Sequence, residues 1–131
     1  MIIIRQVTQP DQDLMASLCG AFIEIVDGGA SMGFLAPLSA AAAVRYWEGV
    51  FASLNQGILL WVAEEDGKIA GSVQLVLCQK ENGSHRAEIQ KLFVMDGFRG
   101  QGISSRLMSE VESCARSMGR TLLVLDTQAG S

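Results

Sequence analysis

The first half of the chain combines one strand-like run with two helix-like patterns. Residues 2–8, IIIRQVT, form a short, mainly apolar run that is typical of a β-strand. A helix is expected from Pro10, with acidic residues in its first turn, to the glycine pair at 28–29, and a second from Ser39 to Gly57. Apolar side chains recur at helical spacing on one face of each, namely Leu14, Leu18, Phe22 and Ile25 in the first and Val44, Trp47, Phe51 and Leu54 in the second.

The second half changes from a helical to a strand-like period. Residues 57–79 indicate two strands joined at Glu-Asp-Gly-Lys, residues 65–68, which is a strong hairpin signal. Residues 86–95 indicate a third strand, and residues 121–126 a fourth of the buried type. Between these two lies a helical pattern over residues 102–119, whose apolar face carries Ile103, Leu107, Val111, Ala115 and Met118.

The resulting order of elements is β-α-α-β-β-β-α-β. It joins an antiparallel meander to one βαβ unit, which predicts an α/β fold with a mixed sheet, of α+β character. A length of 131 residues is typical of one domain, so residues 1–131 are expected to fold as a single unit.

Composition and charge exclude several classes of function. The net charge is −4 and the sequence pI about 4.9, with no cluster of basic residues, so we expect no nucleic-acid partner. No uncharged apolar run approaches the roughly 18 residues that a membrane span requires, and the start of the chain lacks the features of a signal peptide, so the cytoplasm is the expected location. One histidine and three widely spaced cysteines give neither a metal site nor a Ser-His-Asp or Cys-His nucleophile, and we expect no metal.

The stretch FRGQGIS, residues 98–104, combines an arginine and two glycines at the start of the third helix. A P-loop is excluded because no Lys-Ser or Lys-Thr follows the glycines. A dinucleotide fingerprint nearly fits Gly100, Gly102 and Ser105, with Asp126 ending the next strand, but the third glycine is absent. Bare amides at a helix start suit an anion, and glycines let phosphate oxygens approach the backbone. A purely structural glycine-rich turn is the alternative.

Taken with its strand and helix, Arg99-x-x-Gly102-x-Ser104 resembles the signature of the GNAT-type N-acetyltransferases, with Ser104 where the family has Gly or Ala. The resemblance implies the GNAT fold and acetyl-CoA as co-substrate. It places the pyrophosphate on the turn and the pantetheine arm along the preceding strand, where a backbone amide would polarise the thioester carbonyl. The cofactor-binding residues that it implies are Leu92, Phe93, Val94, Arg99, Gly100, Gln101, Gly102, Ile103 and Ser104.

Longer stretches, among them residues 86–94 and 122–131, resemble the tabtoxin resistance branch of this family, which acetylates an amino group of a β-lactam dipeptide toxin. This resemblance implies Glu88 as the base and Asp126 as the partner that orients the substrate. Strand alternation predicts that Glu88 shares a face with Gln90, Leu92 and Val94, and that Lys91 points the opposite way. The loop at residues 27–35 borders the acceptor site in the family.

Family members normally continue with a further helix and two more strands. The tyrosine that protonates the departing thiolate lies on that helix. Tyr46, on the second expected helix, does not match that tyrosine. We therefore expect a C-terminally incomplete domain with weak turnover, and a homodimer formed through the exposed edge of the last strand.

The function expected from these observations is acetyl transfer from acetyl-CoA to a primary amine of a small molecule, with a β-lactam-type toxin or antibiotic as one candidate. Direct transfer is expected because no cysteine has an activating partner in the sequence. Two alternatives remain at this level: a non-catalytic CoA-binding or interaction module, and a protein N-acetyltransferase.

Overall fold

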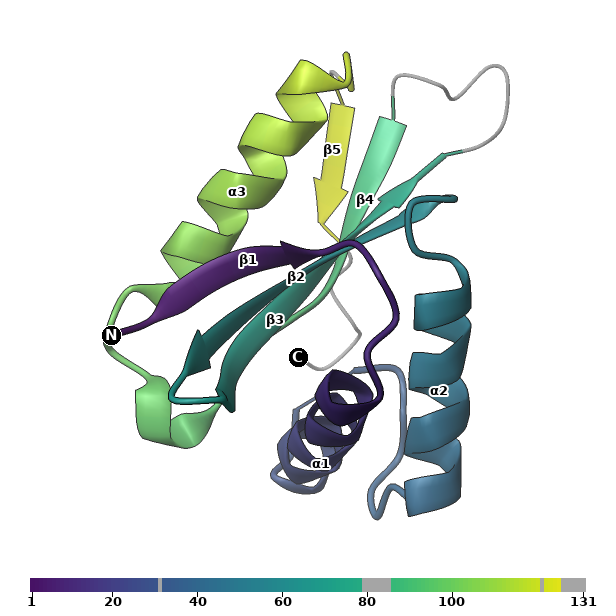
Figure 1. The fold of residues 1–131 in the computed structure, drawn as a ribbon, viewed down its shortest axis with the longest axis vertical. Coiled ribbons are helices and arrows are strands. Elements are labelled where there is room, and N and C mark those ends of the chain that lie inside the picture. Colours follow the sequence, from purple (N-terminus) through teal and green to yellow (C-terminus); the bar gives the residue numbers. More distant parts are fainter. Residues whose placement is uncertain (31, 79–85, 121, 126–131) are drawn as a thin grey trace.

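The computed structural model describes residues 1–30, 32–78, 86–120 and 122–125. The elements follow the expected order, with one additional 3-10 turn, η2 (Figure 1). Their bounds are β1 Ile3–Val7, α1 Gln12–Asp27, α2 Ala40–Ala52, β2 Ile58–Glu65, β3 Lys68–Leu77, β4 Arg86–Val94, η2 Asp96–Phe98, α3 Ile103–Ser117 and β5 Leu122–Leu125.

The strands form one sheet in the order β1-β2-β3-β4-β5. Neighbouring strands from β1 to β4 are antiparallel, whereas β5 runs parallel to β4. The parallel pair is joined through α3, as a βαβ unit requires. The mixed sheet expected from the sequence is therefore confirmed.

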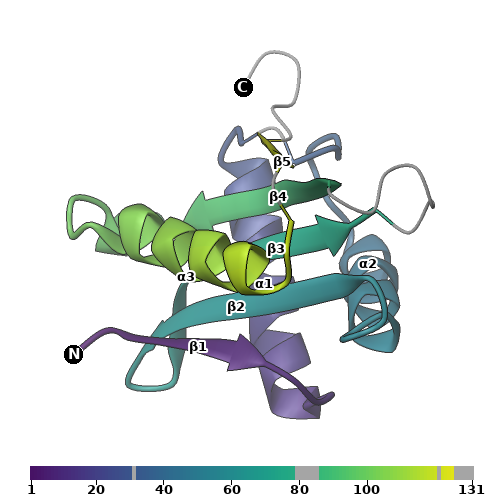
Figure 2. The same ribbon diagram turned by 90° about the horizontal axis from the view of Figure 1, so that it is seen from above.

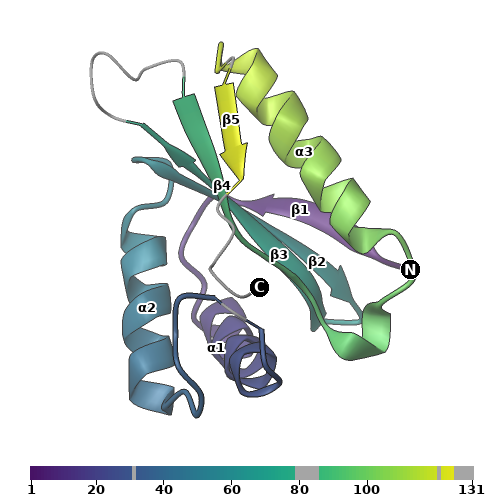
Figure 3. The ribbon, with the colours of Figure 1, turned by 180° about the vertical axis from the view of Figure 1, so that it is seen from behind.

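The helices cover opposite faces of this sheet. α1 and α2 lie together on one face and α3 lies on the other (Figures 2 and 3). Two groups of buried side chains result, one beneath α1 and α2 and one beneath α3. We call them the α1/α2 core and the α3 core.

Side chains cap the starts of the first two helices, at Ser39 as expected and at Asp11, one residue after the expected start at Pro10. Asp11 Oδ1 accepts a hydrogen bond from the Leu14 N–H at 3.1 Å, and Ser39 Oγ accepts one from the Ala42 N–H at 3.1 Å. α2 ends at Ala52 and not at Gly57, where the helix was expected to end, because the residues between them form turns. Its buried stripe begins at Ala43, so the expectation for Val44, which is 39% exposed, was wrong by one position.

The hairpin between β2 and β3 has the expected turn. Asp66 and Gly67 have φ values of 52° and 79°, and two successive left-handed residues are the backbone of a type I′ turn. That turn matches the twist of the strands, which explains the strength of the sequence signal.

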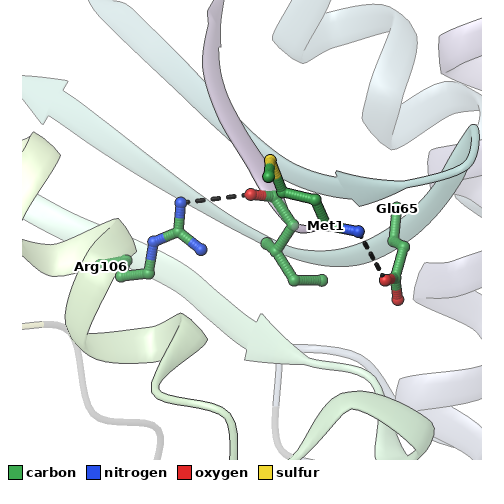
Figure 4. Close-up of polar contacts among 4 residues, drawn as sticks. Met1, Glu65 and Arg106 are labelled. Atoms are coloured by element: carbon green, nitrogen blue, oxygen red, sulfur yellow. Dashed lines mark hydrogen bonds and ion pairs between the residues drawn. The ribbon is translucent and has the colours of Figure 1, made fainter.

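β1 is held at its start by contacts from two directions (Figure 4). The amino group of Met1 lies 3.0 Å from Glu65 Oε1, at the end of β2. On the other side, the Arg106 guanidinium on α3 donates to the Ile2 carbonyl oxygen at 3.2 Å. These contacts join the edge of the sheet to the first turn of α3.

Candidate functional site

The glycine turn before α3 leaves a row of main-chain donors without acceptors in their own helix. Gly100 and Gly102 have φ values of 80° and 73°, a conformation that glycine adopts without strain. The first main-chain bond of α3 runs from the Arg106 N–H to the Gly102 carbonyl at 3.1 Å, so the amides of residues 103–105 have no acceptor within the helix. Gly102 supplies no side-chain cap, unlike Asp11 and Ser39. This helix start is therefore equipped to receive an anion.

The space in front of the turn is open. A Cβ atom built on Gly100 or Gly102 would meet nothing within 4 Å. The side chain of Arg99 lies beside the turn, with its Nε 3.1 Å from Asp96 Oδ1, and both side chains are exposed. A guanidinium and free amides thus face the same opening.

β4 contains a bulge that the sequence did not reveal. Its pairing with β3 shifts between Gln74↔Gln90 and Ser72↔Phe93, and Lys91 adopts a φ of 55°. Such an extra residue reverses the alternation of faces beyond it.

The consequence is a correction to the expected faces of β4. Leu92 and Val94 pack against the α3 core, on the same side as Ala87 and Ile89, whereas Phe93 is buried in the α1/α2 core. Glu88 therefore shares a face with Gln90 but not with Leu92 or Val94.

Lys91 was also expected on the wrong face. Its Nζ lies 5.9 Å from the centroid of the Tyr46 ring, and Tyr46 lies on α2, so Lys91 points to the side of Glu88. The bulge is the physical reason for both corrections.

A pocket of about 340 Å³ lies where β4, η2 and α3 meet. Eight of the nine expected cofactor residues line it; Gln101 is exposed and outside the lining. Residues that the motif did not identify complete the lining of this pocket. Two of them, Ala30 and Met32, lie in the loop that follows α1. The full lining is Ile25, Ala30, Met32, Leu92, Phe93, Val94, Phe98, Arg99, Gly100, Gly102, Ile103 and Ser104.

The pocket lies along the part of β4 that extends beyond its pairing with β5. β5 pairs with β4 from Arg86↔Leu122 to Ile89↔Leu125. Within the described ranges, residues 92–94 have no strand partner on the edge of β4 that pairs with β5. An extended ligand could add hydrogen bonds there as a further strand would.

Glu88 lies in a different cavity from the cofactor residues. It is half-buried and lines a cavity of about 210 Å³ with Val76, Cys78, Arg86 and Val124 among its neighbours. Its Oε1 accepts a hydrogen bond from Gln90 Nε2 at 2.9 Å. Asp126, its expected partner, lies outside the described residues.

A buried polar pair accompanies Glu88 on this face of the sheet. Gln74 is 1% exposed, and its Nε2 donates to the Tyr46 hydroxyl at 2.9 Å. Burial raises the pKa of Tyr46 to about 12, against a smaller opposing effect of the hydrogen bond with Gln74. Sequence reasoning missed this pair because the contact joins residues on separate elements.

The described ranges contain no group of three or more His, Cys, Asp or Glu side chains that could hold a metal ion. No helix within them is both long and apolar enough to cross a membrane.

Comparison with models of protein families identifies the family of this chain. Residues 30–131 match the model described as "Acetyltransferase (GNAT) family". The chain belongs to the GNAT family. A curated GNAT relative, an uncharacterized N-acetyltransferase of the hisH-hisA intergenic region of Azospirillum brasilense, is 36% identical over 113 residues. That alignment covers 85% of this chain but only 66% of the relative.

Solved structures show the GNAT fold as well. An N-acetyltransferase from Staphylococcus aureus Mu50 has a TM-score of 0.77 at 17% identity, covering 100% of this chain and 76% of that one. A predicted acetyltransferase from Clostridium acetobutylicum, solved with acetyl-CoA, has a TM-score of 0.69 at 16% identity, covering 98% of this chain and 82% of that one. The expectation of a GNAT fold is confirmed.

Proposed function

We propose that the protein transfers an acetyl group from acetyl-CoA to the primary amine of a small molecule. One observation carries the proposal: within the described ranges, the 340 Å³ pocket brings the part of β4 beyond its pairing with β5, the glycine turn and the start of α3 to one place. Membership of the GNAT family and the acetyl-CoA named for the Clostridium structure support the choice of co-substrate.

The pocket residues fit the parts of that co-substrate. Main-chain groups of residues 92–94 would hold the pantetheine arm, while the α3 amides and Arg99 would hold the pyrophosphate. Open space beside Gly100 and Gly102 accommodates phosphate oxygens. Acetyl-CoA supplies an activated thioester, and a β4 amide would stabilise the charge that develops on its carbonyl oxygen.

Glu88 would act as the general base. An amine is an ammonium ion at neutral pH and must lose a proton before it attacks. Glu88 lies four residues before Leu92 on β4, at most about 13 Å away even along an extended strand, so a chain of several water molecules would relay the proton. Asp126, which follows β5, is proposed to orient the amine.

Direct transfer fits the state of the cysteines. Burial raises the pKa of the Cys19 thiol, with a further contribution from Glu48. Burial likewise raises the pKa of the Cys114 thiol, with Glu110 adding to the effect. A thiol with a raised pKa is a poor nucleophile at neutral pH, which disfavours an acyl-enzyme on Cys19 or Cys114.

The narrowest version of the proposal names a β-lactam-type toxin or antibiotic as acceptor. It rests on the resemblance of residues 86–94 to the tabtoxin resistance branch and on the loop after α1, whose Ala30 and Met32 line the pocket. The rates of acetylation of a β-lactam-type toxin, a simple amine and a peptide would be compared. A preference for the toxin supports this version, a preference for the amine indicates a general small-molecule enzyme, and a preference for the peptide indicates a protein acetyltransferase.

Calorimetric titration with acetyl-CoA tests the pocket. Ser104→Glu places a carboxylate in the lining, where it repels phosphate, and should weaken binding about tenfold or more. Ser105→Glu is the matched control, because it adds the same charge to the same helix start outside the lining, and should weaken binding much less. Arg99→Ala should also weaken binding, with the exposed Arg116→Ala, in the last turn of α3, as its control. A folded wild-type chain that does not bind acetyl-CoA would contradict the proposal.

Glu88→Gln tests catalysis separately from binding. It keeps an oxygen that can accept from Gln90 but removes the base, so kcat should fall by roughly a hundredfold or more. Affinity for acetyl-CoA should stay unchanged, since Glu88 lies outside the pocket that would hold it. A wild-type protein that binds acetyl-CoA but acetylates no amine would instead be a binding module.

A further inference from the structure

Two opposite charges lie on the same face of β4 without neutralising each other. Glu88 and Lys91 are both half-buried and both face α1 and α2. The ion pairs found within the described ranges involve Met1, Arg5 and Arg99, and include neither Glu88 nor Lys91. Arg86 lines the Glu88 cavity but makes no ion pair with it.

The bulge creates this arrangement. In a regular strand Lys91 would point away from Glu88 and Gln90. Its φ of 55° instead turns the side chain toward Tyr46, on the Glu88 face. A left-handed backbone at a residue other than glycine costs free energy, and such strain is often found at ligand sites.

The protein contacts of the two charges leave capacity for a ligand. The Tyr46 ring attracts the Lys91 ammonium at 5.9 Å, but a ring face does not satisfy its three N–H donors. Gln90 donates one hydrogen bond to Glu88 Oε1 and stands between the two charges along the strand. A carboxylate can accept several hydrogen bonds, so Glu88 retains acceptor sites.

We infer that the acceptor carries an anionic group as well as its amine, with the anion at the Lys91 ammonium and the amine near the β4 edge, from which the water relay leads to Glu88. The inference rests on the proposed function and narrows its substrate to amino carboxylates or amino phosphates. The glutamine side chains at 74 and 90 and the Tyr46 hydroxyl form neutral polar surroundings between the two charges. Lys91 is thus a specificity-determining residue.

Matched pairs of acceptors test the inference. β-Alanine is compared with its methyl ester, and O-phosphoethanolamine with ethanolamine; longer ω-amino acids and dipeptides are compared with their methyl esters. The anionic member of at least one pair should have a kcat/KM roughly tenfold higher, mainly through KM, as expected for a charge-assisted hydrogen bond. The two kinds of pair distinguish a carboxylate from a phosphate. Equal kcat/KM values within every pair would overturn the inference.

Substitutions at Lys91 show whether this side chain is responsible. Lys91→Met removes the charge but keeps an unbranched side chain, and should abolish the preference for the anionic member. Lys91→Arg should keep most of it. Neither should change acetyl-CoA affinity, because Lys91 does not line the 340 Å³ pocket. A preference that persists in Lys91→Met would assign recognition to another residue and contradict the inference.

A binding measurement separates this inference from failure of the proposed function. The same acceptors are titrated into isotope-labelled protein while the Gln90 side-chain amide is followed by NMR. Saturable shifts caused by the anionic members, and lost in Lys91→Met, would support the inference even without turnover. Their absence in folded wild-type protein would overturn it, whatever acetyl-CoA binding shows.

Discussion

Tyr46 combines a packed ring with a hydrogen-bonded hydroxyl at the boundary of the α1/α2 core. Its ring stacks on Phe22 at a centroid distance of 5.2 Å and an interplanar angle of 8°. Within the described ranges, its hydroxyl forms hydrogen bonds with the side chain of Gln74, at 2.9 and 3.2 Å. This environment disfavours the tyrosinate anion, which would be poorly solvated.

The ionisation of Tyr46 can be measured directly, because it is the only tyrosine in the sequence. We expect the folded protein to show a pKa of about 12, against the ordinary tyrosine pKa of 10.0 that the unfolded chain should approach. Because the folded-state pKa is the higher one, its contribution to stability is complete below about pH 10 and is lost as the pH rises toward about 12. Near-ultraviolet absorbance of tyrosinate, recorded with and without denaturant, checks this. A folded-state pKa equal to that of the denatured chain would refute it.

At the scale of elements, the approach of β3 to β4 depends on one glycine. A Cβ on Gly71 would lie 2.7 Å from the Phe93 carbonyl oxygen and 3.4 Å from the side chains of Ile103 and Leu107. β3, β4 and the start of α3 all border Gly71. β4 and α3 also form walls of the 340 Å³ pocket. A side chain at Gly71 would therefore disturb stability and ligand binding together.

Gly71→Ala should lower the free energy of unfolding by about 1–3 kcal/mol, because backbone must move to relieve the contact. It should also weaken acetyl-CoA binding. Gly20→Ala is the control: that glycine lies inside α1 with nothing within 4 Å of its Cβ, so alanine should stabilise the protein by about 0.5–1 kcal/mol. Urea unfolding and calorimetry measure both effects. An unchanged stability in Gly71→Ala would show that the strands can separate without cost.

Elements differed in how well the sequence predicted them. The order of helices and strands, the helix start at Ser39 and the hairpin turn follow from local patterns, which the sequence carries. The bulge does not, because a lysine adopts a left-handed backbone only when its neighbours in space require it. The cavity that Glu88 lines includes Val124 and so depends on the pairing of β5, which is also a long-range property. Local signals thus predicted most of the residues that line the 340 Å³ pocket but not the relative orientation of side chains along β4.

At the scale of the molecule, the outer position of β5 bears on association. β5 lies at one end of the sheet, and within the described ranges β4 is its strand neighbour. An apolar outer strand can pair with the same strand of a second molecule, so we predict a homodimer. Sedimentation velocity over a wide range of concentrations should show a monomer–dimer equilibrium. A single monomeric species at the highest concentration would refute the prediction.

The lining of the 340 Å³ pocket comes from both sides of the sheet. Ile25 and Phe93 belong to the α1/α2 core, whereas Ile103 belongs to the α3 core. A molecule held there would touch both halves of the hydrophobic interior, so its binding energy would oppose melting of the whole domain. At a concentration of 100 times Kd, that opposition amounts to about 2.7 kcal/mol. Heating the protein in the presence of many compounds would then rank them as ligands before any reaction is known.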